Sequence, residues 1–292
     1  MAVVNTNIAA SIAQAALARN ERALENAMEQ LSTGRKINSA SDNAAGLAIT
    51  TRMTSQIRGL DQAVRNAYDA VSMVQTAEGA LDEMTAMLQR MRELAVQSGT
   101  GTTDSSDRSY LNAEFTALRD EVDRIANNTE WNGRPILEGR AGGSTFMSGR
   151  ISTVAFQVGM NAAQTISVSF GNFSNSTGGS MSGLASKTLS AVTISSAIIV
   201  ASGAIGALDS ALTTVSAQRA DFGAVQNRLI HAVDNLTNVV TNAEVTRSRI
   251  MDTDYAEATS ELARTQIIQQ AGTAMLAQAN QLPSSVLQLL QN

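Results

Sequence analysis

A seven-residue repeat of apolar side chains runs through the first third of the chain. Its main row comprises Leu60, Ala67, Val74, Leu81, Leu88 and Ala95. Its companion row comprises Ile57, Val64 and Val71 and then, after a shift of one residue, Ala77, Met84 and Met91. Heptad rows place apolar side chains along one helical face, which packs against a partner helix. Because no proline interrupts the pattern, it predicts one helix over residues 43–97, about 80 Å long at ~1.5 Å per residue.

A shorter amphipathic helix is predicted to follow. Gly99–Gly101 indicates the end of the first helix, and Asp104 or Ser105 is a suitable N-cap for the next one. The apolar positions of this second helix, predicted over residues 106–127, are Leu111, Phe115, Leu118, Val122 and Ile125. Their spacing of three and four residues is typical of a helix that buries one face.

The C-terminal half repeats this design. One heptad row comprises Leu208, Val215, Phe222, Leu229, Leu236, Ala243 and Ile250, and its companion row comprises Leu212, Val233 and Val240. Neither half of the chain can bury its apolar stripe alone, so we expect the long helices of the two halves to pack together. The sequence therefore predicts a mainly α fold, a long antiparallel helical bundle or coiled coil formed by both chain ends.

The middle of the chain has a different period. Apolar and polar residues alternate over residues 153–158 and again over residues 165–170, which predicts a small β-hairpin insert. The segment that follows, GNFSNSTGGSMSG, is rich in Gly, Ser and Asn and is typical of a loop. We expect three parts: a terminal helical coiled-coil domain (1–42 with 253–292), a helical bundle with the hairpin (43–170 with 205–252), and a short variable or flexible segment (171–204).

The two termini carry helical stripes but no charge. No charged residue occurs from Met1 to Ala18 or from Thr265 to Asn292. An amphipathic helix of a soluble monomer normally has a charged outer face, whereas here that face consists of Gln, Asn, Ser and Ala. Such ends suit burial against other copies of the chain, and disorder of the isolated chain is compatible with this interpretation. The expected assembly seam comprises Leu17, Leu24, Leu31, Ile268, Met275, Leu282 and Leu289, and Gly272, Ala279 and Val286 accompany its C-terminal row.

Composition removes several classes of function. A net charge of −5 argues against nucleic-acid binding, and the absence of cysteine excludes disulfides, Cys-based zinc sites and thiol catalysis. His231, the single histidine, lies away from the heptad row, and Asp252 and Asp254 suit a helix break or N-cap better than a paired-carboxylate site. We therefore expect no catalytic residue, metal or cofactor, and no enzyme.

Targeting signals are also missing from the sequence as given. The uncharged stretch 188–208 is too rich in Ser, Thr and Gly for membrane insertion, and residues 1–19 lack the features of a secretory signal peptide. A soluble coiled-coil scaffold remains an alternative, but such a protein is expected to have charged termini.

Four segments resemble the bacterial flagellins. They are LSTGRKINSASDNAAGLAI (31–49), NRLIHAVDNL (227–236), SRIMDTDY (248–255) and QQAGTAMLAQANQLPSSVLQLL (269–290). The resemblance extends over approximately residues 1–170 and 205–292, and the region between them is short for this family. A hook–filament junction protein is the closest alternative, but DNAAGLAI and AQANQLPSSVLQLL favour the filament subunit.

The resemblance implies both a function and partners. It implies a structural subunit that polymerises into the flagellar filament for motility, secreted through the flagellar type III apparatus to the extracellular flagellum. Its implied partners are further copies of itself, the filament cap, the hook–filament junction proteins and an export chaperone that holds the C-terminal helix.

A second implied partner is Toll-like receptor 5. The segment QRMRELAVQ (89–97) resembles the helix that this receptor contacts in recognised flagellins, so that Arg90, Leu94 and Glu114 would form the receptor-binding site. Spacing alone instead favours an ordinary solvated ion pair between Arg90 and Glu114, with Leu94 at the edge of the seam.

Overall fold

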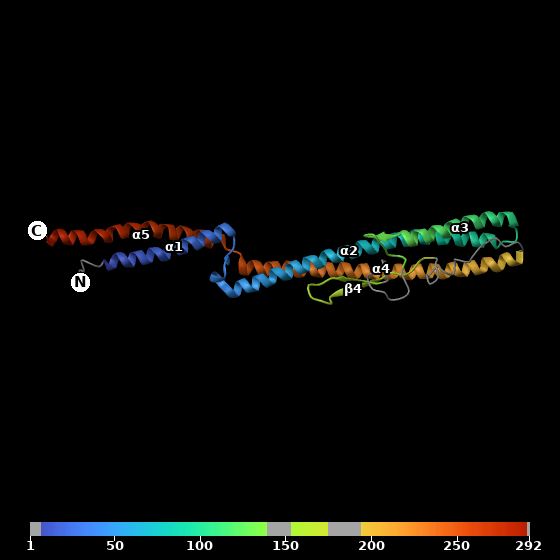
Figure 1. Ribbon diagram of the computed structural model, residues 1–292, viewed down its shortest axis with the longest axis horizontal. Coiled ribbons are helices and arrows are strands. Elements are labelled where there is room, and N and C mark those ends of the chain that lie inside the picture. Colours follow the sequence, from blue (N-terminus) through green and yellow to red (C-terminus); the bar gives the residue numbers. More distant parts are fainter. Residues whose placement is uncertain (1–6, 139–152, 175–193, 291–292) are drawn as a thin grey trace. The chain divides into compact units, whose positions relative to one another are not determined.

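The computed structural model describes residues 7–138, 153–174 and 194–290, with side-chain surroundings omitted for 194–199 and 282–290. The elements in chain order are α1 (Ile8–Thr33), α2 (Ala40–Ser98), α3 (Ser105–Asn128), β1 (Glu130–Trp131), β2 (Arg134–Pro135), β3 (Thr153–Gln157), β4 (Thr165–Ser169), α4 (Ile194–Met251) and α5 (Tyr255–Leu290) (Figure 1). The chain divides into two compact units, Met1–Arg58 with Thr241–Asn292, and Gly59–Val240. The mainly α fold with a small hairpin insert is confirmed.

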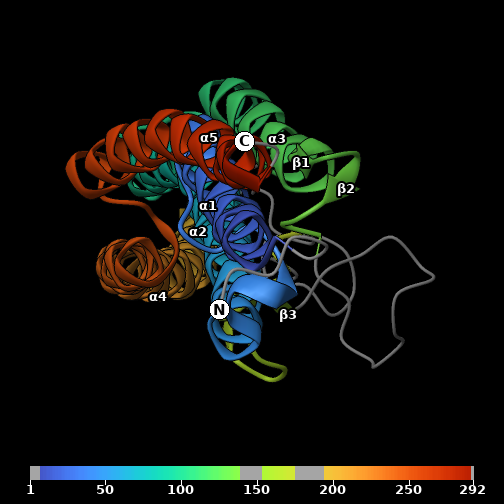
Figure 2. The same cartoon turned by 90° about the vertical axis from the view of Figure 1, so that its left-hand side faces the viewer.

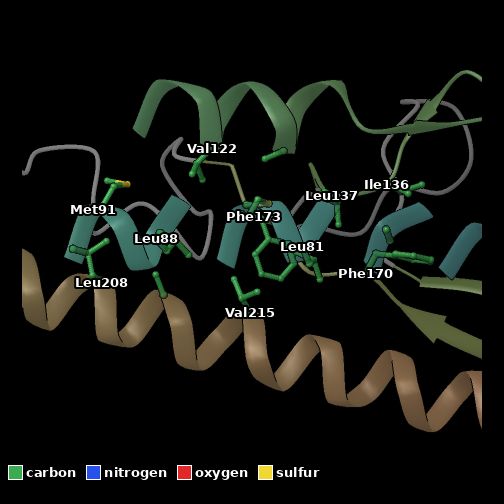
Figure 3. Packing of buried hydrophobic residues seen from close by; sticks show 14 of the residues in the cluster. Leu81, Leu88, Met91, Val122, Ile136, Leu137, Phe170, Phe173, Leu208 and Val215 are labelled. Carbon is green, nitrogen blue, oxygen red and sulfur yellow. The ribbon is translucent and has the colours of Figure 1, made fainter. Parts of the chain in front are cut away.

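The core of the unit Gly59–Val240 lies between α2, α3 and α4. Figure 3 shows Leu81 and Leu88 of α2 between Val122 of α3 and Leu208 and Val215 of α4. Every main-row residue of the first predicted heptad is buried, as are those of the second row from Leu208 to Leu236. The predicted pairing of the two long helices is therefore confirmed, because each apolar stripe is removed from water by the other.

Two small hairpins complete this unit. The turn between β1 and β2 uses Asn132 and Gly133, which have φ values of 51° and 73°, the left-handed conformation that suits a two-residue hairpin loop. Strands β3 and β4 pair antiparallel, with Val154 opposite Val168 and Phe156 opposite Ile166. The predicted hairpin at 153–170 is thus confirmed, and its alternation places one face against the helices.

Residues at both ends of the predicted variable segment 171–204 pack against the helical bundle. At its start, Phe173 is fully buried and its backbone N–H donates to the carbonyl oxygen of Leu137. At its end, α4 already begins at Ile194, and Ala201 and Ala204 are buried in the bundle. These residues are ordered because the core covers them, which local composition does not reveal. The remainder of the predicted segment, residues 175–193, lies outside the described residues.

The unit formed by the chain ends pairs α1 with α5, which lie side by side in both views (Figures 1 and 2). Gly34 ends α1 in the left-handed conformation at φ 68°, and its N–H donates to the carbonyl oxygen of Gln30. The connections on either side then pair with each other: Lys36 N–H donates to Met251 O at 2.7 Å, and Thr253 N–H donates to Gly34 O at 3.1 Å. The helical run expected from residue 43 begins at a kink, where Asn43 has φ −162° and accepts a hydrogen bond from Gly46 N–H.

A carboxylate stabilises the turn that precedes this kink. The Asp42 Oδ2 atom accepts hydrogen bonds from the backbone N–H groups of Ser39 at 2.8 Å and Asn38 at 3.0 Å. These bonds, that of Ser39 first, lower the pKa of Asp42 below its ordinary value, because they stabilise the ionised carboxylate.

Candidate assembly surface

The interface between α1 and α5 buries small and polar residues. Its most buried members are Asn20, Ala27, Ala258 and Thr265, with exposed fractions from 2% to 9%. The contact is close, because a Cβ atom added at Gly272 would lie 2.7 Å from Leu17 Cδ2. Small side chains allow close approach but remove little apolar area from water, so this interface supplies little hydrophobic stabilisation for its length.

Several of the larger apolar side chains of the same two helices are exposed instead. Ile8 and Ile12 of α1 are 57% and 65% exposed, and Ile267, Ile268 and Met275 of α5 are 66%, 45% and 66% exposed. No charged residue interrupts either end of the chain at these positions. We call these five residues the outer apolar face. Its residues are typical of a core rather than of a solvated helix surface.

The residues of the predicted seam are divided between the α1/α5 interface and the outer apolar face. Leu17, Leu24 and Leu31 are half-buried, whereas Ile268 and Met275 belong to the outer apolar face. The side chains of Leu282 and Leu289 lie outside the described part of the chain. Toward α1, α5 instead presents the companion row, in which Gly272 meets Leu17 and the Ala279 carbonyl oxygen accepts a hydrogen bond from Asn7 Nδ2 at 2.9 Å.

Three members of the outer apolar face were missed in the sequence: Ile8, Ile12 and Ile267. The spacing of Ile8 and Ile12, four residues apart in an uncharged helix, is the signal that could have identified the first two. Ile267 precedes a heptad residue and carries no such signal, because adjacent residues of a helix point about 100° apart.

Charge is confined to one end of the α1/α5 pair. Its acidic and basic residues begin at Arg19 on α1 and end at Arg264 on α5. Arg264 donates to Glu261 at 2.6 Å, and this hydrogen bond raises the pKa of the guanidinium. The pair is therefore solvated at its charged end and presents uncharged side chains over the remainder.

The predicted receptor residues lie on α2 and α3. Arg90 Nε donates to Glu114 Oε1 at 2.9 Å, and Arg90 Nη1 donates to Glu93 Oε2 at 3.0 Å. The hydrogen bond that Arg90 donates to Glu114, followed by the one that it donates to Glu93, raises the pKa of Arg90. The two charged side chains are about half exposed, at 50% and 44%, but Leu94 is only 1% exposed and belongs to the core. Arg90 and Glu114 thus form one surface, and Leu94 lies beneath it.

The remaining polar candidates have structural roles. Asp254 caps α5, since its Oδ1 atom accepts a hydrogen bond from Ala256 N–H at 2.8 Å, as predicted for an N-cap. His231 is exposed, also as predicted. Over the described ranges, His, Asp and Glu side chains form no group of three that could hold a metal ion. None of the helices described is both long and apolar enough to cross a membrane.

Comparisons with known proteins identify the family. Residues 4–141 match the bacterial flagellin N-terminal helical region, and residues 205–290 match the bacterial flagellin C-terminal helical region. Flagellin of Bacillus subtilis (strain 168) is 44% identical over 301 aligned residues, which include 98% of this chain and 99% of that protein. Flagellin A of Vibrio cholerae (O395) is 37% identical over 375 aligned residues, with 99% of each chain included.

A solved structure supports the fold. The chain resembles a putative flagellar hook-associated protein from Vibrio parahaemolyticus with a TM-score of 0.58 at 14% identity, covering 72% of this chain and 100% of that one. At this identity the likeness concerns the fold alone. The two family matches and the full-length relatives define a structural filament protein rather than an enzyme. The chain belongs to the bacterial flagellins, and it is a structural component of the flagellar filament.

Proposed function

We propose that the outer apolar face is the surface through which copies of this chain contact one another in the filament. The observation that carries this proposal is the distribution of side chains on α1 and α5. The most buried residues between the two helices are small or polar, whereas Ile8, Ile12, Ile267, Ile268 and Met275 are exposed. Full burial of one such side chain contributes about 1.5–3 kcal/mol, so neighbouring copies stabilise helices that pair weakly alone.

Serine substitutions test this assignment directly. The triple variant Ile267→Ser, Ile268→Ser, Met275→Ser removes the three residues that α5 contributes to the outer apolar face. We expect loss of sedimentable filaments and of tubes in electron microscopy. The matched control is Gln266→Ser, Gln270→Ser, Gln278→Ser, which places three serines at exposed polar positions of the same helix. Filaments from the apolar triple variant, at the yield of the control, would contradict the proposal.

Membership of the family supports the remaining proposed partners. We assign the uncharged stretch Thr265–Asn292 to the export chaperone, since its apolar residues require cover before assembly. Export by the flagellar type III apparatus then delivers the chain to the extracellular filament, between the junction proteins and the distal cap. Co-purification of the chaperone with the full chain, and its loss with the triple serine variant, would test the first assignment.

A second function is recognition by Toll-like receptor 5. It is supported by the exposed ion pair between Arg90 and Glu114, which brings α2 and α3 together on one surface. Leu94 contributes indirectly, because its buried side chain packs in the core and holds α2 in position. The test compares Arg90→Ala with Arg92→Ala, whose own ion pair with Asp209 is equally exposed. In receptor reporter cells, soluble Arg90→Ala should signal weakly and Arg92→Ala normally; wild-type signalling by Arg90→Ala would exclude this site.

A further inference from the structure

A polar side chain lies inside the α1/α5 interface. Asn20 is 9% exposed, and its Nδ2 atom donates to the Thr265 carbonyl oxygen at 2.8 Å and to Gln269 Oε1 at 3.1 Å. Both acceptors belong to α5. A buried amide without an acceptor is costly, so this residue favours the alignment of α1 and α5 that supplies both partners.

A second contact specifies the same alignment by shape. Leu17 occupies space beside Gly272, where an added Cβ atom would lie 2.7 Å from Leu17 Cδ2 and 3.1 Å from Leu17 Cγ. The residues seven positions before and after this glycine are Thr265 and Ala279, and both carry a Cβ atom. Leu17 therefore fits best opposite Gly272.

A slip of the helices by one heptad removes both contacts. In one direction Asn20 would face Leu262 in place of Gln269, and Leu17 would face Thr265. In the other direction Asn20 would face Leu276, and Leu17 would face Ala279. The amide loses its side-chain acceptor in either case, whereas the small residues along the interface discriminate poorly between these registers.

We propose that Asn20, Gln269, Leu17 and Gly272 form a register lock that fixes the alignment of α1 on α5. A polar residue at one core position of a coiled coil specifies register at some cost in stability. The consequence for assembly rests on the proposed function: the outer apolar face combines residues of both helices. A slip of one heptad would displace the α1 residues of this face by about 10 Å relative to its α5 residues, at ~1.5 Å per residue. Copies of the chain in different registers would then no longer present the same surface.

Disulfide trapping in the soluble full-length chain tests the register lock. The chain contains no cysteine, so only introduced thiols react. Leu17→Cys with Gly272→Cys reports the observed register. Leu17→Cys with Thr265→Cys, or with Ala279→Cys, reports the two slipped registers. The ratio of observed-register to slipped cross-link is then compared between chains with Asn20 and chains carrying Asn20→Leu.

With Asn20 present, we expect the observed-register cross-link to predominate. Asn20→Leu should lower the ratio about tenfold, since loss of the side-chain acceptor of the amide no longer penalises the slipped registers. Gln14→Leu, at an exposed position of α1, is the matched control and should leave the ratio unchanged. The double variant Asn20→Leu, Gln269→Leu controls for a folding defect caused by the single substitution. In this variant α1 and α5 should pair at least as stably as in the parent chain, but the ratio of observed-register to slipped cross-link should be as low as in Asn20→Leu.

An unchanged ratio in Asn20→Leu, or equal trapping of all three registers in the chain that retains Asn20, would overturn the register lock. Because cross-linking needs no filaments, these results are independent of the sedimentation test of the outer apolar face. Loss of filaments in the serine variant together with an unchanged ratio in Asn20→Leu would support assembly through that face and exclude the lock.

Discussion

The Nε atom of Arg108 donates a hydrogen bond to the carbonyl oxygen of Ser98 at 3.2 Å. The guanidinium comes from α3 and is only 2% exposed, and it reaches the last residue of α2. The final carbonyl groups of a helix have no partner within the helix. Arg108 therefore closes the C-terminal end of α2 and secures the turn that leads into α3.

We expect Arg108→Met to destabilise the unit Gly59–Val240 by about 2–3 kcal/mol, because a charged hydrogen bond is lost and a buried carbonyl is left without its partner. Denaturant unfolding followed by the fluorescence of Trp131, the single tryptophan, measures this change. Arg92→Met is the matched control, since its ion pair with Asp209 is about half exposed and should contribute less than about 1 kcal/mol. Equal effects of the two substitutions would refute the capping role.

Phe222 is the aromatic contact between α4 and the β3–β4 hairpin. It is fully buried, and its ring centroid lies 5.4 Å from that of Phe170. We expect Phe222→Ala to lower the free energy of unfolding by about 3–5 kcal/mol, through lost burial and the cavity that remains. Tyr110→Ala, at a side chain that is 73% exposed, should change it by no more than about 0.5 kcal/mol. Thermal unfolding of both variants gives the comparison.

Deletion of Thr265–Asn292 should abolish filament formation while leaving the unit Gly59–Val240 folded. The deleted segment holds exposed apolar residues of α5, and its described side chains, up to residue 281, are not part of the core of that unit. Sedimentation measures assembly, and the Trp131 unfolding transition measures the remaining unit. Normal filaments from the truncated chain would disprove this prediction, as would loss of the transition.

Asp42 should stabilise its turn in a pH-dependent manner. Its folded pKa is depressed below 3.8, so its contribution is fully present above that value and is lost as pH falls through the folded pKa. We expect Asp42→Ala to be less stable than the parent near neutral pH and to converge with it in strong acid. Circular dichroism during thermal unfolding at several pH values measures this difference. A gap between the two chains that does not depend on pH would exclude the carboxylate as its cause.

The heptad rows were sufficient to predict the bundle, because apolar side chains at every seventh position form a stripe that is buried by packing against a partner helix. Leu81 and Leu208 lie in the core for this reason. The hairpin at 153–170 followed similarly from its period of two. Composition did not reveal that Phe173 and Ala204, at the two ends of the segment 171–204, are buried, because their burial depends on helices distant in the sequence.

The site was predicted less completely than the fold. Absence of charge predicted that the chain ends are surfaces for burial, but α1 and α5 carry apolar residues on more than one face. Periodicity alone does not reveal which face meets the other helix. Leu94 illustrates the same problem: its motif indicates a surface contact, and its side chain lies in the core.

By itself, the sequence determined the helical class, the pairing of the long helices and the uncharged character of the ends, since periodicity and composition are local properties. Only the tertiary structure decided which residues of the ends face each other. Gly272 and Asn20 lie between α1 and α5, and Ile268 and Met275 lie outside. The physical reason is that close helix packing requires small side chains and satisfied polar groups at the contact, and this selection depends on both helices together.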